Sequence, residues 1–236
     1  IVCLGAGAAG LASMHLLKAL GAKDENLYMV DRTGVIHSGR DDLNEYKQEF
    51  SLPVETSQED AFTNADVVVG LSRPGTFGAE DIKRMAADPI VFTLANPTPE
   101  MFPEEVREVR PDAVIATGRS DFPNQVNNVL GFPFIFRGAL DVRAKKINME
   151  MKVAASEALA AMARKEVPEY ISELYGTKVA FGRDYIIPKP FDKRLIVEVS
   201  SAVAAAALHS GASTRSDFDI EVYKEELAKR ICAEFD

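Results

Sequence analysis

This sequence has few basic residues and few cysteines. Its 27 Lys and Arg are outnumbered by 36 Asp and Glu, which gives a formal net charge of −9. Binding to a phosphate backbone relies on basic patches, so nucleic acid is not an expected partner. Cys3 and Cys232 lie near opposite ends of the chain and neither belongs to a C-x-x-C pair, which excludes zinc and redox motifs of that kind. Cys3 falls in an apolar run and is predicted to be a small core residue.

Long apolar runs are missing as well. No stretch approaches the roughly 18 residues of a membrane span, and no signal peptide is visible. We therefore expect no membrane partner and a cytoplasmic location. The chain does not begin with Met, and only four residues precede its first glycine, so we expect further sequence before Ile1.

The clearest signal that is present is a glycine-rich turn. An apolar run over residues 1–4 leads into Gly5-Ala6-Gly7-Ala8-Ala9-Gly10, and a helix-forming run follows over residues 11–20. Asp31 closes a second apolar run at residues 27–30. Strand, G-x-G-x-x-G turn, helix and distal acid, in this order, are typical of a dinucleotide-binding site.

Each part of this pattern has a physical task. Gly5 permits the tight turn, Gly7 lets a pyrophosphate approach the backbone, and Gly10 lets the helix pack close to the sheet. The helix N-terminus offers free N–H groups and a partial positive charge to phosphates, and Asp31 can accept hydrogen bonds from the adenine ribose. The residues predicted to bind NAD or NADP here are Gly5, Gly7, Ala8, Ala9, Gly10 and Asp31.

Strands and helices alternate through the first half of the chain. Further strands are predicted at residues 66–71, 90–94 and 113–116, and helices at residues 42–50, from 57, and at 79–86 and 103–109. This alternation predicts an α/β fold with an open, doubly wound parallel sheet of the Rossmann type. Ligands of such sheets bind where strands end, which makes the loops at residues 72–77, 95–99 and 117–128 candidates for ligand binding, the first of them beginning at Ser72.

The second half of the chain is predicted to be helical. The helices are expected at residues 132–144, 149–165, 193–209 and 217–235. We predict a dinucleotide-binding core over residues 1–148 and a C-terminal helical extension over residues 149–236 that packs on the same domain.

The loop after the last predicted strand carries a more specific signal. Residues 117–128 read TGRSDFPNQVNN and continue as VLGFPFIFRGALD. Amide side chains can orient a carboxylate without adding charge, although a capped turn is the alternative interpretation. This run resembles the malic enzyme family in its bacterial form. Further matches to the family are ANPT at residues 95–98, Glu100, and IPKPFD at residues 187–192. The likeness extends from the glycine turn to about residue 212.

The resemblance implies oxidative decarboxylation of L-malate to pyruvate and CO₂ with reduction of NAD or NADP, assisted by Mg²⁺ or Mn²⁺. In this family the general base, the acid and the metal ligands lie upstream of the glycine turn, in a substrate and metal domain that this chain does not contain. We therefore assign no catalytic residue and no metal ligand here. The 236 residues alone are expected to bind cofactor without converting malate.

The residues that the resemblance carries over concern binding. Asn96 matches the family's Asn beside substrate and nicotinamide, and Asn127 and Asn128 match the paired Asn that reach the malate carboxylate and the nicotinamide side of the pocket. Ser72 is a further candidate for the cofactor. The resemblance also implies a homodimer or a larger homo-oligomer.

The choice of cofactor stays open at this point. Asp31 favours NAD because a carboxylate repels a 2′-phosphate, whereas Arg32 beside it, or Arg40, can pair with that phosphate. Two other functions remain alternatives: a different two-domain dehydrogenase, for example of an amino acid, and a non-catalytic dinucleotide-sensing module.

Overall fold

The computed structural model describes residues 1–215 and 217–233. Contacts divide the chain into two compact units, Ile1–Val126 and Asn127–Asp236. This division falls after Val126, and the domain boundary that we predict at residue 148 stays a prediction. Each unit is described by itself below.

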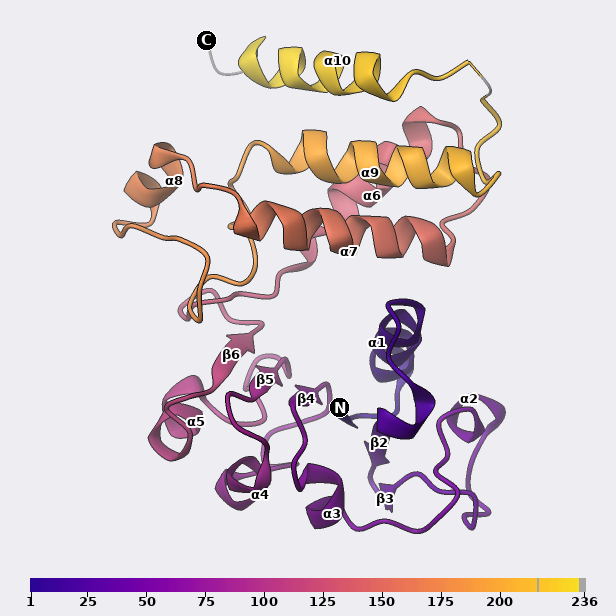
Figure 1. Ribbon diagram of the computed structural model, residues 1–236, viewed down its shortest axis with the longest axis vertical. Helices are drawn as coiled ribbons and strands as arrows, with labels where there is room; N and C mark the ends of the chain where they lie inside the picture. Colours follow the sequence, from indigo (N-terminus) through magenta and orange to yellow (C-terminus); the bar gives the residue numbers. More distant parts are fainter. Residues whose placement is uncertain (216, 234–236) are drawn as a thin grey trace. The chain divides into compact units, whose positions relative to one another are not determined.

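The described residues of the first unit form one six-stranded sheet in the order β3-β2-β1-β4-β5-β6 (Figure 1). The strands are β1 (Val2–Leu4), β2 (Tyr28–Asp31), β3 (Gly34–Val35), β4 (Val67–Gly70), β5 (Ile90–Thr93) and β6 (Val114–Thr117). Every neighbouring pair is parallel except β2 with β3. The doubly wound parallel sheet is thus confirmed, and its strand order reverses between β1 and β4, where ligands of such sheets bind. The two-residue strand β3 was not predicted, because it is too short to show a periodic pattern.

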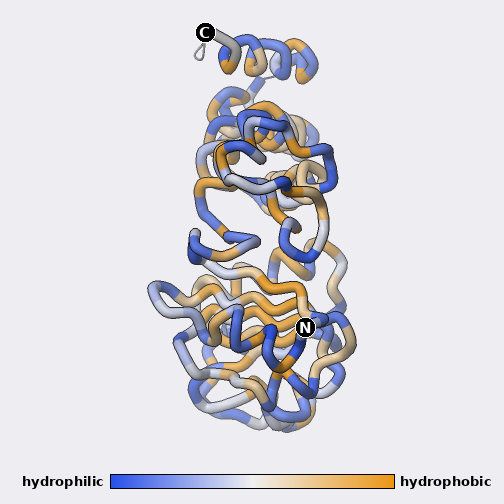
Figure 2. The backbone as a smooth tube through the Cα atoms, turned by 90° about the vertical axis from the view of Figure 1, so that its left-hand side faces the viewer, coloured by the Kyte–Doolittle hydropathy of each residue, from blue (hydrophilic) through white to orange (hydrophobic). Residues whose placement is uncertain are grey.

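Helices cover both faces of this sheet. They are α1 (Ala8–Ala19), α2 (Glu45–Gln48), α3 (Gln58–Phe62), α4 (Ala79–Arg84) and α5 (Pro103–Val109). Met14 of α1 packs on one face with Cys3 and Met29, while Phe62 of α3 and Ile82 of α4 belong to the core of the other face. Figure 2 shows the hydrophobic strands inside this unit and hydrophilic loops around them. Such two-sided cover explains why the strands are continuous apolar runs.

Cys3 lies at the centre of the sheet. Its side chain is fully buried, and burial raises the pKa of its thiol to about 12. The prediction that Cys3 is a small core residue is confirmed.

The second unit is helical where the structure describes it. Its helices are α6 (Phe132–Asp141), α7 (Met149–Arg164), α8 (Glu169–Leu174), α9 (Leu195–His209) and α10 (Ile220–Ala233). The apolar helix α9 lies in the middle, with α6, α7 and α10 packed against it. The predicted end of the last helix at residue 235 lies outside the described residues. None of the helices in the described ranges is both long and apolar enough to cross a membrane.

Several helices are shorter than predicted, and for two of them the structure shows why. The helix expected over residues 42–50 covers only Glu45–Gln48, because the Asn44 side chain caps it by accepting the Lys47 N–H at 3.0 Å. The helix expected over residues 132–144 ends at Asp141, because Arg143 adopts a left-handed backbone with φ of 52°.

Arg110, directly after α5, ties two helices of the first unit together. Its Nη1 donates to the carbonyls of Ile82 (3.1 Å) and Met85 (3.0 Å), and its Nη2 donates to that of Ala86 (2.6 Å). The guanidinium also pairs with Asp112 through Nε (2.8 Å) and Nη2 (2.7 Å). One cation therefore donates to three carbonyls at the end of α4, of which that of Ile82 also accepts the Met85 N–H.

We expect Arg110→Ala to lower the free energy of unfolding by about 2–4 kcal/mol, because three carbonyls lose a charged donor and Asp112 loses its cation. Urea unfolding followed by circular dichroism measures the change. Arg84→Ala is the matched control: its exposed ion pair with Glu59 contributes less than about 1 kcal/mol. Equal stability of the two variants would contradict this assignment.

Candidate functional site

A pocket of about 410 Å³ lies in the first unit, at the switch point of the sheet. Residues at the ends of β1 and β2 and in the loop after β4 line it. Four of the predicted cofactor residues meet there: Gly5, Asp31, Arg32 and Ser72. Sequence reasoning missed Gln58 of α3, which also lines the pocket and whose Nε2 holds the Thr76 carbonyl of that loop at 3.1 Å.

The glycine turn beside this pocket leaves no room for side chains at two positions. Gly5 has φ of 124°, and a Cβ there would lie 2.5 Å from the Leu71 carbonyl oxygen. A Cβ on Gly10 would lie 1.8 Å from the Gly5 oxygen and 3.4 Å from Cys3 Sγ. The start of α1 is therefore pressed against the strand edge, as close packing of helix on sheet requires.

The N-terminus of α1 is open. Gly7 is its N-cap, and no side chain among the described residues caps the helix or places an acid in its first turn. A Cβ on Gly7 would meet nothing within 4 Å, and Ala8 and Ala9 are exposed. The first turn of a 12-residue helix thus presents free N–H groups and the positive end of its dipole. These features fit the pyrophosphate of a dinucleotide.

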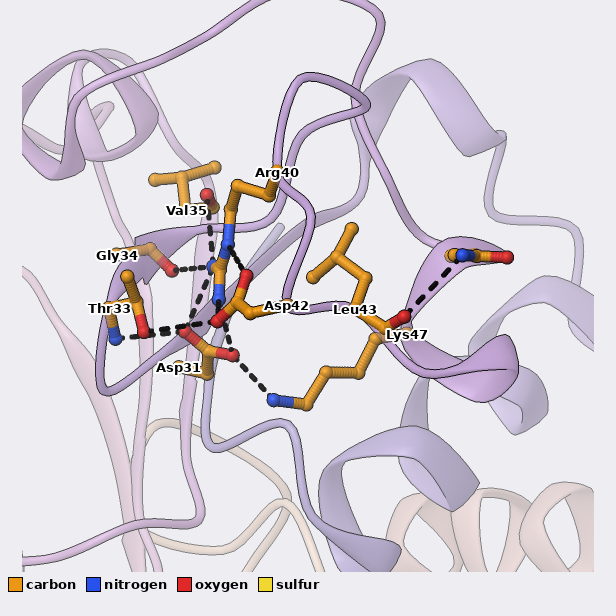
Figure 3. Close-up of polar contacts among 9 residues, drawn as sticks. Asp31, Thr33, Gly34, Val35, Arg40, Asp42, Leu43 and Lys47 are labelled. Carbon is orange, nitrogen blue, oxygen red and sulfur yellow. Dashed lines mark hydrogen bonds and ion pairs between the residues drawn. The ribbon is translucent and has the colours of Figure 1, made fainter.

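Asp31, at the end of β2, is surrounded by donors (Figure 3). Its Oδ1 accepts the Thr33 N–H at 3.0 Å and Arg40 Nη1 at 2.9 Å. Its Oδ2 accepts Arg40 Nη2 at 3.0 Å and the ammonium of Lys47. A carboxylate has about four lone-pair positions, so all of them are used here. A ribose hydroxyl can bond to Asp31 only if a donor moves, and Lys47, with its single contact, is the easiest to displace.

This environment keeps Asp31 ionised. Partial burial favours the neutral acid, but hydrogen bonds from Arg40, Lys47 and the Thr33 N–H outweigh it and hold the pKa of Asp31 well below its usual value. With two cations against it, the carboxylate presents little net negative charge to the pocket.

Of the two arginines proposed for a 2′-phosphate, only Arg32 is available. Arg40 has a side chain that is 8% exposed and is held by Asp42 as well, through Nε at 2.8 Å and Nη2 at 2.7 Å. Arg32 is exposed and lines the pocket, as does Arg73 from the loop after β4. Within the described ranges neither Arg32 nor Arg73 has a carboxylate partner.

Ser72 and Asn96 are exposed residues of the loops after β4 and β5. One residue separates Ser72 from the end of β4, and two residues separate Asn96 from the end of β5. The N–H of Ser72 and that of Ala95, which precedes Asn96, both donate to the buried side chain of Glu100. The sequence singled out Glu100 only as part of a family motif. An acid seven residues beyond the end of a buried strand was the signal available for it.

Asn127 and Asn128 belong to the second unit. Asn127 caps the short 3₁₀ helix Asn128–Leu130, with its Oδ1 accepting the Val129 N–H at 3.1 Å, and Asn128 is exposed. A capped turn, the alternative interpretation of this segment, is thus part of its structure. Because Asn96 lies in the first unit, a common site for the three asparagines stays a prediction.

Over the described residues, no three side chains of His, Cys, Asp or Glu form a group that could hold a metal ion.

Comparison with known proteins points to one family. Residues 1–176 match the family model "Malic enzyme, NAD binding domain". The chain is 60% identical over 217 residues to a NADP-dependent malic enzyme of Halomonas elongata, covering 91% of this chain and 51% of that protein. It is 49% identical over 234 residues to a NAD-dependent malic enzyme of Rhizobium meliloti, covering 98% of this chain and 30% of that protein.

A solved structure agrees with these relatives. The crystal structure of Entamoeba histolytica malic enzyme matches with a TM-score of 0.87 and 35% identity, over 98% of this chain and 47% of that one. The chain therefore spans from about a third to half of the length of the proteins that it matches.

The Asp31 cluster predicts a pH-dependent contribution to stability. Because the pKa of Asp31 is lower in the folded state than its unfolded value of about 3.9, the stabilisation is present above about pH 5 and is lost as the pH falls below 4. Asp31→Asn should therefore lower the free energy of unfolding most near pH 7, and the difference from the parent protein should shrink toward pH 3. Urea unfolding at a series of pH values measures it. Asp41→Asn, an exposed neighbour, is the control; a pH-independent difference for Asp31→Asn would refute the prediction.

Proposed function

The chain belongs to the malic enzyme family, and from this we propose that it is the NAD(P)-binding part of an enzyme that converts L-malate to pyruvate and CO₂. The observation that carries the proposal is the open N-terminus of α1 beside the pocket at the switch point of the sheet. The first turn of α1 contains no acid, so the positive end of this helix suits the two phosphates of a dinucleotide.

In this proposal the residues of the glycine turn bind the pyrophosphate. Gly7, Ala8 and Ala9 offer N–H groups, while Gly5 and Gly10 keep the turn close to the sheet. Ser72 contacts the cofactor from the loop after β4. When bound, NAD(P) accepts the hydride that leaves C2 of malate.

The asparagines orient the reacting groups in this proposal. Asn96 holds the nicotinamide and the substrate from the loop after β5, and Asn127 and Asn128 hold the malate carboxylate. Neutral amides suit this task because they supply donors for a carboxylate and acceptors for the carboxamide of the nicotinamide.

The divalent metal of the proposed reaction finds no ligand group in the described residues, so no step through it is derived for this chain. We place the metal ligands, the general base and the acid in the remaining sequence of the full-length protein. A homo-oligomeric assembly and a cytoplasmic location likewise remain predictions.

The pocket favours NADP over NAD. Asp31, the residue that would repel a 2′-phosphate, is compensated by Arg40 and Lys47, and the pocket is lined by the exposed cations Arg32 and Arg73. We propose that Arg32 pairs with the 2′-phosphate, because Arg presents a planar fork of donors to phosphate oxygens.

Two alternatives are distinguishable from this proposal. An amino-acid dehydrogenase would oxidise its own substrate class and leave malate untouched. A dinucleotide-sensing module would bind the cofactor without turnover, and its full-length sequence would lack the Lys, Tyr and acidic ligands upstream of the glycine turn.

The activity itself is the first test. The full-length protein with Mn²⁺ and NADP should form pyruvate and CO₂ from L-malate, followed by NADPH absorbance and pyruvate assay. Asn127→Ala should lower kcat/KM for malate about tenfold or more, because a substrate carboxylate loses a hydrogen bond. Asn148→Ala, which loses a structural helix cap instead, is the control and should leave kcat/KM nearly unchanged. No pyruvate from the parent protein would exclude the proposed function, and unchanged kinetics of Asn127→Ala would remove this residue from the site.

Cofactor choice is tested separately. Arg32→Ala should raise the KM for NADP about tenfold and leave the KM for NAD within about twofold, since only NADP carries the 2′-phosphate. Arg230→Ala, an exposed arginine on α10, serves as the control for loss of one positive charge. An equal effect of Arg32→Ala on both cofactors would mean that Arg32 contacts a group that they share.

A further inference from the structure

Glu100 is a buried carboxylate that joins two ligand-side loops. Its side chain is 4% exposed. Oε1 accepts the N–H of Ser72 at 2.9 Å, after β4, and Oε2 accepts the N–H of Ala95 at 3.1 Å, after β5. The main-chain carbonyl of Glu100 accepts the N–H of Gly75 at 3.0 Å, so the same residue holds the first loop at a second point.

Gly70, the last residue of β4, makes room for this carboxylate. A Cβ at position 70 would lie 2.6 Å from Cδ of Glu100 and 2.7 Å from its Oε2. Any larger residue would displace the Glu100 side chain from both N–H groups. The position of the Glu100 carboxylate therefore depends on the absence of a side chain at Gly70.

The bonding partners of Glu100 show what the contact does. Among the described residues its carboxylate is held by main-chain N–H groups and forms no ion pair with a cation. A buried carboxylate without these hydrogen bonds would be strongly unfavourable, so the two loops and the acid stabilise one another. The N–H donors belong to Ser72, which lines the pocket, and to Ala95, the residue before Asn96; both follow the carboxyl ends of neighbouring strands.

We propose that Glu100 is a positioning residue for the dinucleotide. It fixes the spacing between the loop of Ser72 and the loop of Asn96, so that both side chains are in place before the cofactor arrives. The inference rests on the proposed function, because Ser72 and Asn96 are cofactor residues only within it. Because the two loops are already ordered, less conformational entropy is lost when the dinucleotide binds, and its affinity is higher.

Glu100→Gln separates this role from a purely structural one. Glutamine has nearly the same shape, but its NH₂ faces one of the two N–H groups, so one loop loses its acceptor. In the full-length protein we expect the KM for NADP and the Kd for NADPH, measured by fluorescence titration, to rise about tenfold, as for loss of one hydrogen bond to a charged group. Partial unfolding would lower only the apparent kcat and leave the KM and the Kd unchanged.

Two further variants complete the test. Glu108→Gln, the same change on the exposed side of α5, should leave the KM and the Kd within about twofold of the parent values. Gly70→Ala keeps the acid but displaces it, so it should raise both constants as Glu100→Gln does. The double variant should then be little worse than either single one, because both remove the same contact.

The outcomes separate the two proposals. Parent protein that converts malate, with Glu100→Gln and Gly70→Ala unchanged in KM and Kd, overturns the positioning role and leaves the proposed function intact. Failure of both variants to fold also overturns it, since Glu100 would then be a residue of the fold. A parent protein that forms no pyruvate but shows the same rise in Kd refutes the proposed function and supports the role of Glu100 in nucleotide binding.

Discussion

The first unit depends on a close approach of three main-chain segments at Gly5. The turn after β1, the first turn of α1 and Leu71, the residue after β4, meet there with no side chain between them. This contact places the open end of a helix beside the reversal point of the sheet, and the pocket follows from it. Any side chain at Gly5 or Gly10 would separate helix and strand, so the site and the fold share one steric constraint.

The net charge of the pocket depends on the ion pairs of Asp31 more than on the presence of this acid alone. An acid at the end of the second strand is usually an indicator of NAD, but here Arg40, Lys47 and a main-chain N–H occupy Asp31 fully. Arg40 in turn is shared with Asp42. The acid and its partners thus form a network that orders the segment after β2, while Arg32, which has no carboxylate partner among the described residues, lines the pocket.

The sequence was most informative where a pattern is local. The five parallel strands, the glycine turn, the helix α9 and the buried thiol of Cys3 were predicted, because continuous apolar runs and turn chemistry act over short distances. Saturation of Asp31 was not foreseen, since Lys47 lies 16 residues away and only the folded chain brings them together. For the same reason, Glu100 and Gly70 could not be paired from the sequence. The site roles of Ser72, Asn96, Asn127 and Asn128 stay predictions.

The thiol in the first strand has a practical consequence. With a pKa of about 12 and no exposed surface, Cys3 carries almost no thiolate and is closed to reagents while the sheet is intact. Alkylation at this position therefore requires that the central strand be transiently released. The rate at which Cys3 is alkylated therefore reports how often the central strand unfolds locally. A bound ligand that stabilises the sheet would lower this rate.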